Sequence, residues 1–438
     1  MTAFDPPAHI KYILRRLTDC GHAAFLIGGC VRDSIIGRSV HDWDVASSAT
    51  PAEVSAIFDK TLLTGERFGG VTVVLPDGAV EVTAFRAERD YRDGRRPDNV
   101  EFVSNLNEDL SRRDFTINSM AVSLTGELVD PFGGRADIEN RLIRCVGAPD
   151  ARFNEDALRM FRALRLSAEL GFDIEKDTLS SVYANAGRAR LISAERVRAE
   201  LERTLLSANP RIAGEMIDSG LLAKFLKPTH RCAPASLGLE RLSALPARPA
   251  PRWCAFCVIL FDAGLIGNVE VFLRDMRLDN RTVKLCAAVS SVKEFREFTD
   301  FKEDGAGIKR LLAKHGTDAT LCAAAVYDAL QGRAQPTDAQ PTDAPQPNAP
   351  QPNAPPPDAP PPDAPPPVLA RVEEIVKSGE CFTLGDLAVT GNDLIALGYR
   401  PGRELGETLA RLLAHVLERP EDNTRDTLLQ ILKKNCGF

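Results

Sequence analysis

The sequence predicts a multidomain protein in which an α/β domain with a small mixed β-sheet is followed by all-α domains. Residues 1–145 alternate helical segments with short β-branched runs such as FLIGGC, GGVTVVL and AVEVTAF, a pattern typical of a mixed domain. From about residue 150 to 333, and again over residues 368–438, apolar residues follow helical spacing with few strand signals. A chain of 438 residues is also too long for one ordinary core.

Composition favours a soluble protein without a membrane partner. The chain is 44% hydrophobic and 26% charged, and no run approaches the roughly 18 apolar residues of a membrane span. No secretory signal is evident in MTAFDPPAHIKYILRRLTDC, so we expect a cytoplasmic location. The net charge of -7 gives no general sign of nucleic-acid binding, although a groove needs only a positive lining of its own.

The ten cysteines are scattered along the chain, which favours reduced thiols over a disulfide framework. Cys254 and Cys257 form the one close pair, in PRWCAFCVIL. Their apolar flanks favour core packing over metal or redox chemistry. No feature of the sequence indicates a stable protein partner.

A proline-rich segment over residues 334–367 repeats with a five-residue period and contains no Lys or Arg. Proline at this density excludes helix and sheet, so we expect a semi-rigid spacer. A Pro-rich ligand for a partner is the alternative, but the run lacks a basic anchor. The spacer separates the helical region before it from residues 368–438.

Two aspartates, Asp42 and Asp44, alternate in the strand-like stretch HDWDVASSATP. Alternate side chains of a strand share a face, so the two carboxylates repel each other unless a cation offsets them. Hard oxygen ligands beside phosphates suit Mg²⁺, which can activate a hydroxyl and neutralise a leaving pyrophosphate. Two exposed carboxylates on an edge strand are the alternative. The preceding run, FLIGGCVRDSIIG, favours the metal site, because glycines between a strand and a helix let backbone amides approach a triphosphate.

In this combination the chain resembles the nucleotidyltransferases that include bacterial CCA-adding enzymes and bacterial poly(A) polymerases. The first similar signature is GGCVRDSIIGRSVHDWD, followed by RRDFTINSMAV, DPFGGRADIENRLIRCVGAP and RFNEDALRMFRALRLSAELGF. The resemblance is strong over about the first 210 residues and returns in VTGNDLIALGYRPGRELGETLARLL. Residues 211–333 match only in their helical character.

The resemblance implies metal-dependent, template-independent addition of CCA to tRNA from CTP and ATP, with release of pyrophosphate. It implies a catalytic head over residues 1–145, a base-recognising neck over 146–210, a body that contacts RNA over 211–333 and a tail that contacts tRNA over 368–438. The proline-rich spacer of residues 334–367 lies between the body and the tail. Asp42 and Asp44 are then the metal ligands, and the nucleotide contacts in the head are Gly29, Arg32 and Arg113.

Two further positions bear on the head. Glu81 in AVEVTAF resembles an accessory carboxylate, and an outward-facing strand glutamate is the alternative. The segment GERFGGVTV departs from the family at Phe68, where histidine is common, and at Gly70, where threonine is common. Both positions lie outside the metal and base-reading motifs.

The segment EDALRMFRALR predicts a helix with one polar row beside an apolar stripe. The polar row repeats every three residues as Asp156, Arg159, Arg162 and Arg165. A solvated face of ion pairs is one interpretation. In the other, the Asp acceptor and the Arg donor match cytosine and adenine, which present an amino donor beside a ring-nitrogen acceptor, and reject guanine and uracil. The resemblance favours this second interpretation: Asp156 and Arg159 read the base edge, while Arg162 and Arg165 position the base and phosphates.

Several activities compete with full CCA addition. A poly(A) polymerase typically carries a basic and aromatic signature after the D-x-D motif, which is absent here, and a non-catalytic RNA-binding module has no reason to keep Asp42 and Asp44. CC-adding enzymes typically shorten the segment RAERDYRDGRRPDNVEF, which here is full length and includes Arg95, Arg96 and Pro97. We expect this segment to be a mobile loop beside the site. An A-adding enzyme would keep the loop.

Overall fold

The computed structural model describes residues 4–65, 69–89, 99–229, 237–291, 305–332 and 367–435. These residues form two compact units, of which the first extends to Leu226 and the second begins at Lys227. Within the described ranges, each helix is too short or too polar to span a bilayer.

A mixed sheet of seven strands forms the centre of the first unit. Its order is β3-β4-β5-β2-β1-β8-β9. Its strands are β1 (Ala24–Ile27), β2 (Val45–Ser47), β3 (Thr61–Gly65), β4 (Gly70–Leu75), β5 (Gly78–Ala84), β8 (Ala121–Ser123) and β9 (Leu128–Val129). Strand β2 runs parallel to β5 and antiparallel to β1. The sheet and the helices that follow it confirm the predicted fold class.

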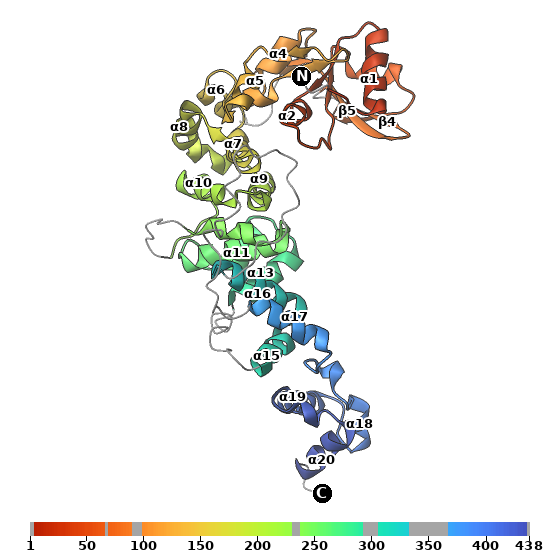
Figure 1. Cartoon of the computed structure of the whole chain (residues 1–438), viewed down its shortest axis with the longest axis vertical. Helices are drawn as coiled ribbons and strands as arrows, with labels where there is room; N and C mark the ends of the chain where they lie inside the picture. The colour runs from red at the N-terminus through yellow and green to blue at the C-terminus, as the bar shows by residue number, and fades with distance from the viewer. Residues whose placement is uncertain are drawn as a thin grey trace, which may run out of the picture. The chain divides into compact units, whose positions relative to one another are not determined.

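Local sequence explains the order of these elements. Pro76 and Asp77 connect β4 to β5, and the register pairs Leu75 with Gly78 across this two-residue turn. The helices of the head are α1 (Ala8–Asp19), α2 (Gly29–Ile36), α3 (Pro51–Ile57), α4 (Leu106–Ser111) and α5 (Gly134–Glu139). Helices α1 and α2 pack against β1, and α3 packs against β4 and β5; Figure 1 labels all of these helices except α3. Thr50 begins α3 with a capping box to Glu53, which satisfies free N–H groups of the first turn.

Part of the segment that we expected to be a loop is paired. Strands β6 (Arg86–Arg89) and β7 (Asn99–Phe102) form a separate antiparallel ribbon. The prediction of a loop was wrong for these two ends of the segment. The two strands satisfy their backbone N–H and C=O groups by pairing with each other, and the weak apolar pattern of the sequence did not indicate this pairing. Residues 90–98, which include Arg95, Arg96 and Pro97, lie outside the described residues, as does Phe68.

Helices complete the first unit. A short parallel pair, β10 (Leu142–Ile143) and β11 (Asp173–Ile174), joins the end of the head to the helical part. The helices are α6 (Pro149–Glu155), α7 (Leu158–Leu170), α8 (Lys176–Asn185), α9 (Ala194–Leu206) and α10 (Ala213–Asp218). Leu164 on α7 and Leu201 on α9 are both buried, and these two helices pack closely against each other.

The second unit is helical in its described part. Its helices are α11 (Pro249–Asp262), α12 (Val269–Asp275), α13 (Asn280–Ser291), α15 (Gly305–His315), α16 (Thr317–Leu330), α17 (Val368–Ser378), α18 (Gly391–Ala396), α19 (Arg403–Glu418) and α20 (Arg425–Asn435). Figure 1 shows α11, α13 and α16 close together, and the three pack against one another. Cys254 and Cys257 are buried on α11, and Cys254 Sγ lies 3.2 Å from Cys286 Sγ.

Candidate active site

The turn from β1 into α2 brings the backbone close to two charged side chains. Gly28 has φ +74°, in the region that favours glycine. A Cβ at this position would lie 3.2 Å from Arg113 Nη1 and 3.9 Å from Asp44 Oδ2. We predicted a nucleotide contact at Gly29, which is the first residue of α2. The sequence indicated that the backbone approaches a ligand at both glycines of the turn, and the structure shows that Gly28 is the one with a left-handed backbone.

Asp42 and Asp44 lie in the irregular segment before β2 and not within the strand, as we had expected. The carbonyl of Asp44 accepts a hydrogen bond from the N–H of Ile27 at 3.1 Å, and the strand register begins at Val45, which pairs with Leu26. Strand β2 therefore begins at Val45, where its ladder pairing with β1 begins. Both aspartates are exposed.

A pocket of about 280 Å³ contains Asp44 and opens at the end of β1. Its lining combines carboxylates with guanidinium groups and consists of Ile27, Asp44, Gly70, Glu81, Thr83, Arg86, Arg112 and Arg113. Acidic groups can hold a cation, while the arginines can hold phosphate oxygens. The pocket therefore has the groups that a nucleoside triphosphate with a bound metal ion requires.

Asp44 is in an environment that disfavours its charged form. Surrounding protein atoms raise the pKa of its carboxyl even though the residue is open to solvent on one side. The Arg113 guanidinium opposes this rise, and the negative charges of Glu81 and Asp42 add to it. The carboxylates thus repel one another in the protein alone, which is the condition that a bound cation relieves.

The donor set fits a divalent metal ion that takes part of its coordination shell from its substrate. Glu81 on β5 lines the pocket with Asp44, which favours the accessory-carboxylate interpretation over an outward-facing glutamate. Among the described residues, no group of three or more His, Cys, Asp or Glu side chains is arranged to hold a metal. Asp42 and Asp44 would hold the ion, with phosphate and water oxygens as the remaining ligands.

Arg113 is held at the pocket by α4. Its Nη2 donates to Asp109 Oδ2 at 3.1 Å, and Arg112 Nη2 donates to Asp109 Oδ1 at 2.6 Å. The sequence reasoning identified Arg113 but did not consider Arg112 or Asp109.

Arg32 on α2 has polar partners of its own. It pairs with the neighbouring Asp33 at 2.9 Å and donates from Nη1 to Asn118 Oδ1 at 2.7 Å. Asn118 Nδ2 in turn donates to Asp114 Oδ1 at 3.2 Å. Arg162 Nη2 lies 2.6 Å from Asp114 Oδ2, so Arg32 and Arg162 are connected through two side chains.

Asp156 does not lie on the helix that carries the three arginines, contrary to our expectation. It follows α6 with an extended backbone at φ -143°, and its Oδ1 accepts from the N–H of Leu158 at 3.0 Å, next to the start of α7. This local hydrogen bond stabilises a break that apolar periodicity does not reveal. Arg196 on α9 holds the carboxylate, with Nη2 2.6 Å from Oδ2.

Arg159 and Arg165, the two α7 arginines of the predicted polar row besides Arg162, also have partners of their own. The side chain of Arg159 donates to Glu155 Oε2 at 2.8 Å and to the carbonyl of Arg112 at 3.0 Å. Its backbone N–H donates to the carbonyl of Asp156 at 3.0 Å. Arg165 is 3% exposed and pairs with Glu169 and Glu200. The structure thus gathers Arg159 and Arg162 around residues 112–114 and places Arg165 in the helical core.

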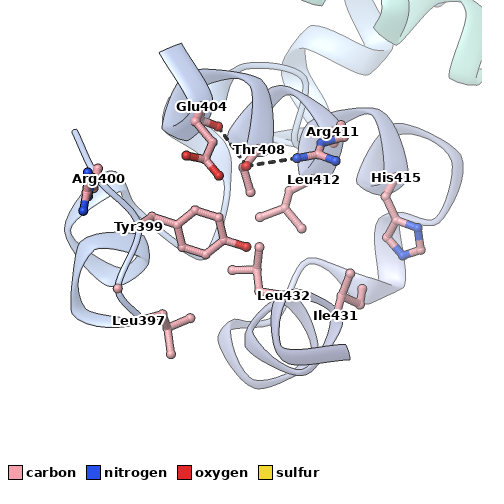
Figure 2. Close-up of a pocket in the computed structure, with 11 residues that line it drawn as sticks. Leu397, Tyr399, Arg400, Glu404, Thr408, Arg411, Leu412, His415, Ile431 and Leu432 are labelled. Carbon is pink, nitrogen blue, oxygen red and sulfur yellow. Dashed lines mark hydrogen bonds between the residues drawn. The ribbon is translucent and has the colours of Figure 1, made fainter. Parts of the chain in front are cut away.

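A second pocket, of about 670 Å³, lies between α19, α20 and the segment before α19 (Figure 2). Leu412 and Leu432 line it beside Tyr399, with Arg411 and Glu404 at one side. It is larger than the pocket at β1, and Glu404 is the single carboxylate among its lining residues. Its chemistry suits binding and not phosphoryl transfer.

Comparison with known proteins agrees with this geometry. A family model described as the poly A polymerase head domain matches residues 24–144, a range that includes the whole lining of the β1 pocket. The CCA-adding enzyme of Limosilactobacillus fermentum is 36% identical over 435 residues, which cover 98% of this chain and 96% of that protein. The chain belongs to the CCA-adding enzyme family. The resemblance found in the sequence is thereby confirmed.

Other CCA-adding enzymes match over similar lengths. The enzyme of Enterococcus faecalis is 34% identical, over 96% of this chain and 94% of that protein. The crystal structure of the Bacillus stearothermophilus CCA-adding enzyme in complex with CTP covers 99% of each chain at 30% identity, with a TM-score of 0.75. Two more family models match the helical parts. They are described as a probable RNA and SrmB-binding site of polymerase A, over residues 171–232, and as a putative domain 2 of tRNA nucleotidyltransferase, over residues 368–432.

Proposed function

We propose that this member of the CCA-adding enzyme family completes the 3′ end of tRNA with C, C and A, using CTP and ATP. One observation carries the proposal: the pocket that sets Asp44 and Glu81 beside Arg112 and Arg113 lies in a chain whose likeness to CCA-adding enzymes extends over nearly its whole length. The bacterial relatives support a cytoplasmic site of action as part of this proposal.

The chemistry follows from the two kinds of charge in the pocket. The 3′ hydroxyl of tRNA gives up its proton to solvent and its oxygen attacks the α-phosphorus of the nucleotide. A new P–O bond forms, and the bond between the α-phosphorus and the α–β bridging oxygen breaks to release pyrophosphate. Asp42 and Asp44 would hold the divalent ion typical of the family, which we propose to be Mg²⁺ and which would supply Lewis-acid activation of the hydroxyl. Glu81 adds negative charge at that site. Arg113 and Arg32 hold the triphosphate and orient its leaving group.

We place base selection at the junction of α6 and α7. Asp156 accepts and Arg159 donates, which matches the Watson–Crick edges of cytosine and adenine. Arg196 and Glu155 hold these two side chains in the protein alone, so the pair is oriented before a base arrives. Arg162 on α7 forms an ion pair with Asp114, which holds α7 next to the pocket residues Arg112 and Arg113.

The helical domains then serve to hold tRNA. We propose a head over residues 1–145, a neck over 146–210, a body over 211–333 and a tail over 368–438, with the spacer of residues 334–367 between body and tail. The family-model descriptions of residues 171–232 and 368–432 support RNA contact by these parts. The tail pocket beside Tyr399 and Arg411 is a candidate surface for this contact.

A direct test uses three tRNA transcripts, which end at the discriminator base, at C and at CC. With CTP and ATP, the wild-type protein is expected to extend all three to CCA, and the Asp44→Asn protein to extend none. Extension of only the CC-ended transcript would identify an A-adding enzyme, and arrest after CC would identify a CC-adding one.

Poly(A) polymerase is the second candidate, because the family model that matches the head is described by that activity. Oligo(A) and a tRNA ending at the discriminator base would be compared as primers at equal concentration. Preferential extension of oligo(A) with ATP would overturn the proposal. Binding of tRNA without incorporation of either nucleotide would instead indicate a non-catalytic module.

A further inference from the structure

Asp109 on α4 is a buried carboxylate that holds two arginines of the pocket. It is 1% exposed. Its Oδ1 accepts from Arg112 Nε at 3.1 Å and from Arg112 Nη2 at 2.6 Å, while its Oδ2 accepts from Arg113 Nη2 at 3.1 Å. Both guanidinium groups line the pocket, and Asp109 does not.

This arrangement keeps Asp109 charged in spite of its burial. Burial by itself raises the pKa of the carboxyl, but Arg113 and Arg112 outweigh that effect and hold the pKa below its ordinary value. A buried carboxylate that pairs with two guanidinium groups fixes the orientation of both arginine side chains. Either arginine would lose a charge-assisted hydrogen bond if it rotated away from the carboxylate. The side chain of Arg113 is 18% exposed, so part of its guanidinium surface remains open to a ligand.

We propose that Asp109 is a positioning residue, which sets Arg113 at the place where the triphosphate of the incoming nucleotide binds. The inference rests on the proposed nucleotidyltransferase function. Arg113 Nη1 lies 3.2 Å from the position of a Cβ on Gly28, beside Asp44 Oδ2. Asp109 therefore acts at a distance from the substrate, by directing a cation toward the glycine turn and the metal-binding carboxylates.

An amide at this position would affect the two arginines unequally. Oδ1 receives three donors, two from Arg112 and the N–H of Arg86 at 3.4 Å. Oδ2 receives two, Nη2 of Arg113 at 3.1 Å and Nε of Arg113 at 3.4 Å. In Asp109→Asn the amide oxygen should take the place of Oδ1, which leaves the NH₂ group facing the guanidinium of Arg113. Two donors then oppose each other. The substitution should therefore release Arg113 and leave Arg112 in place.

The test measures the affinity of the full chain for CTP and for CMP by titration calorimetry with magnesium chloride and without tRNA. Wild-type protein should bind CTP more tightly than CMP. Asp109→Asn should weaken CTP binding roughly ten-fold and CMP binding less than about two-fold, because CMP lacks the β- and γ-phosphates. In an Arg113→Ala background, Asp109→Asn should have no additional effect on CTP affinity.

Asp137 provides a matched control. It is 5% exposed and pairs with Arg144 and the hydroxyl of Thr116, none of which lines the pocket. Asp137→Asn should lower the melting temperature while the CTP to CMP affinity ratio stays at the wild-type value. A general loss of stability would therefore not reproduce the change expected for Asp109→Asn.

Four results would overturn the inference. A wild-type protein that binds CTP no more tightly than CMP removes the proposed nucleotide site itself. A normal wild-type preference that Asp109→Asn retains, or a further loss in the Arg113→Ala background, refutes the role of Asp109 alone. If Asp109→Asn does not fold, Asp109→Glu keeps the charge but moves the carboxylate, and an unchanged CTP preference in that variant refutes the role equally.

Discussion

Arg162 on α7 donates from Nε to Oδ2 of Asp114 at 2.7 Å, across 48 residues of sequence. Asp114 directly follows Arg113, so this contact joins the side of the pocket proposed to bind phosphate to the helix proposed to position the base. Burial raises the pKa of Asp114, but Arg162 and Arg159 outweigh that effect and hold it well below its ordinary value. The pair thus couples two parts of the proposed nucleotide site through one buried charge.

Replacement of Asp114 should destabilise the first unit. Asp114→Asn removes a buried charged partner and is expected to cost about 1–3 kcal/mol in urea unfolding at pH 7. Because the folded pKa is lowered, the stabilisation is present above the unfolded pKa and is lost as the pH falls through the folded value. The difference from wild type should therefore shrink in acid. Glu139→Gln, which breaks an exposed pair with Arg135, should change stability by less than about 0.5 kcal/mol, and an equal effect of both variants would contradict the prediction.

Replacement of Asp44 should abolish incorporation without loss of stability. The folded pKa of Asp44 is raised, so its ionised form costs folding free energy at neutral pH, and this cost disappears as the pH falls through the folded pKa. Asp44→Asn and Asp42→Asn are therefore expected to retain or exceed the wild-type melting temperature while incorporating neither CTP nor ATP. Near wild-type turnover with Mg²⁺ in either variant would refute the metal assignment.

Alanine substitutions at Gly28 and Gly21 should distinguish the effect of backbone strain from the effect of crowding at the site. Both have positive φ, at +74° and +87°, but a Cβ at Gly21 would meet nothing within 4 Å. Each Gly→Ala change should cost about 1–2 kcal/mol of stability for the left-handed backbone. Only Gly28→Ala should also weaken CTP binding, because its methyl group displaces Arg113. Equal CTP affinities in the two variants would show that the close approach at Gly28 is not used.

Asp156 and Arg159 should control the choice of base. Removal of either partner with Ala should cost about 1–3 kcal/mol of discrimination, so UTP or GTP should begin to compete in incorporation assays. Arg203→Ala provides the control, because Arg203 pairs with Glu169 on the outside of the helices and is 58% exposed. Unchanged selectivity in both test variants, with measurable activity, would return this region to a purely structural role.

The sequence alone predicted the parts of the fold that depend on local pattern. Strand β1 followed by a doubled glycine and a helix is visible in FLIGGCVRDS, and the β4 to β5 turn is visible in its Pro-Asp-Gly. The helical character of α7 and α9 follows from apolar spacing. The break at Asp156 was not predictable in this way, because it depends on one side-chain hydrogen bond and on Arg196 from another helix.

What the sequence determined by itself is the chemistry of the site: a glycine turn, an aspartate pair and arginines in ordered motifs that identify the family. Only the tertiary structure decided which of these groups meet. It set Glu81 beside Asp44, gave the side chains of Asp156 and Arg159 different partners, and placed Arg165 in a buried pair. The reason is physical: motif order records residue type and local spacing, whereas contacts between distant segments depend on how sheet and helices pack and on which charges must find partners when buried.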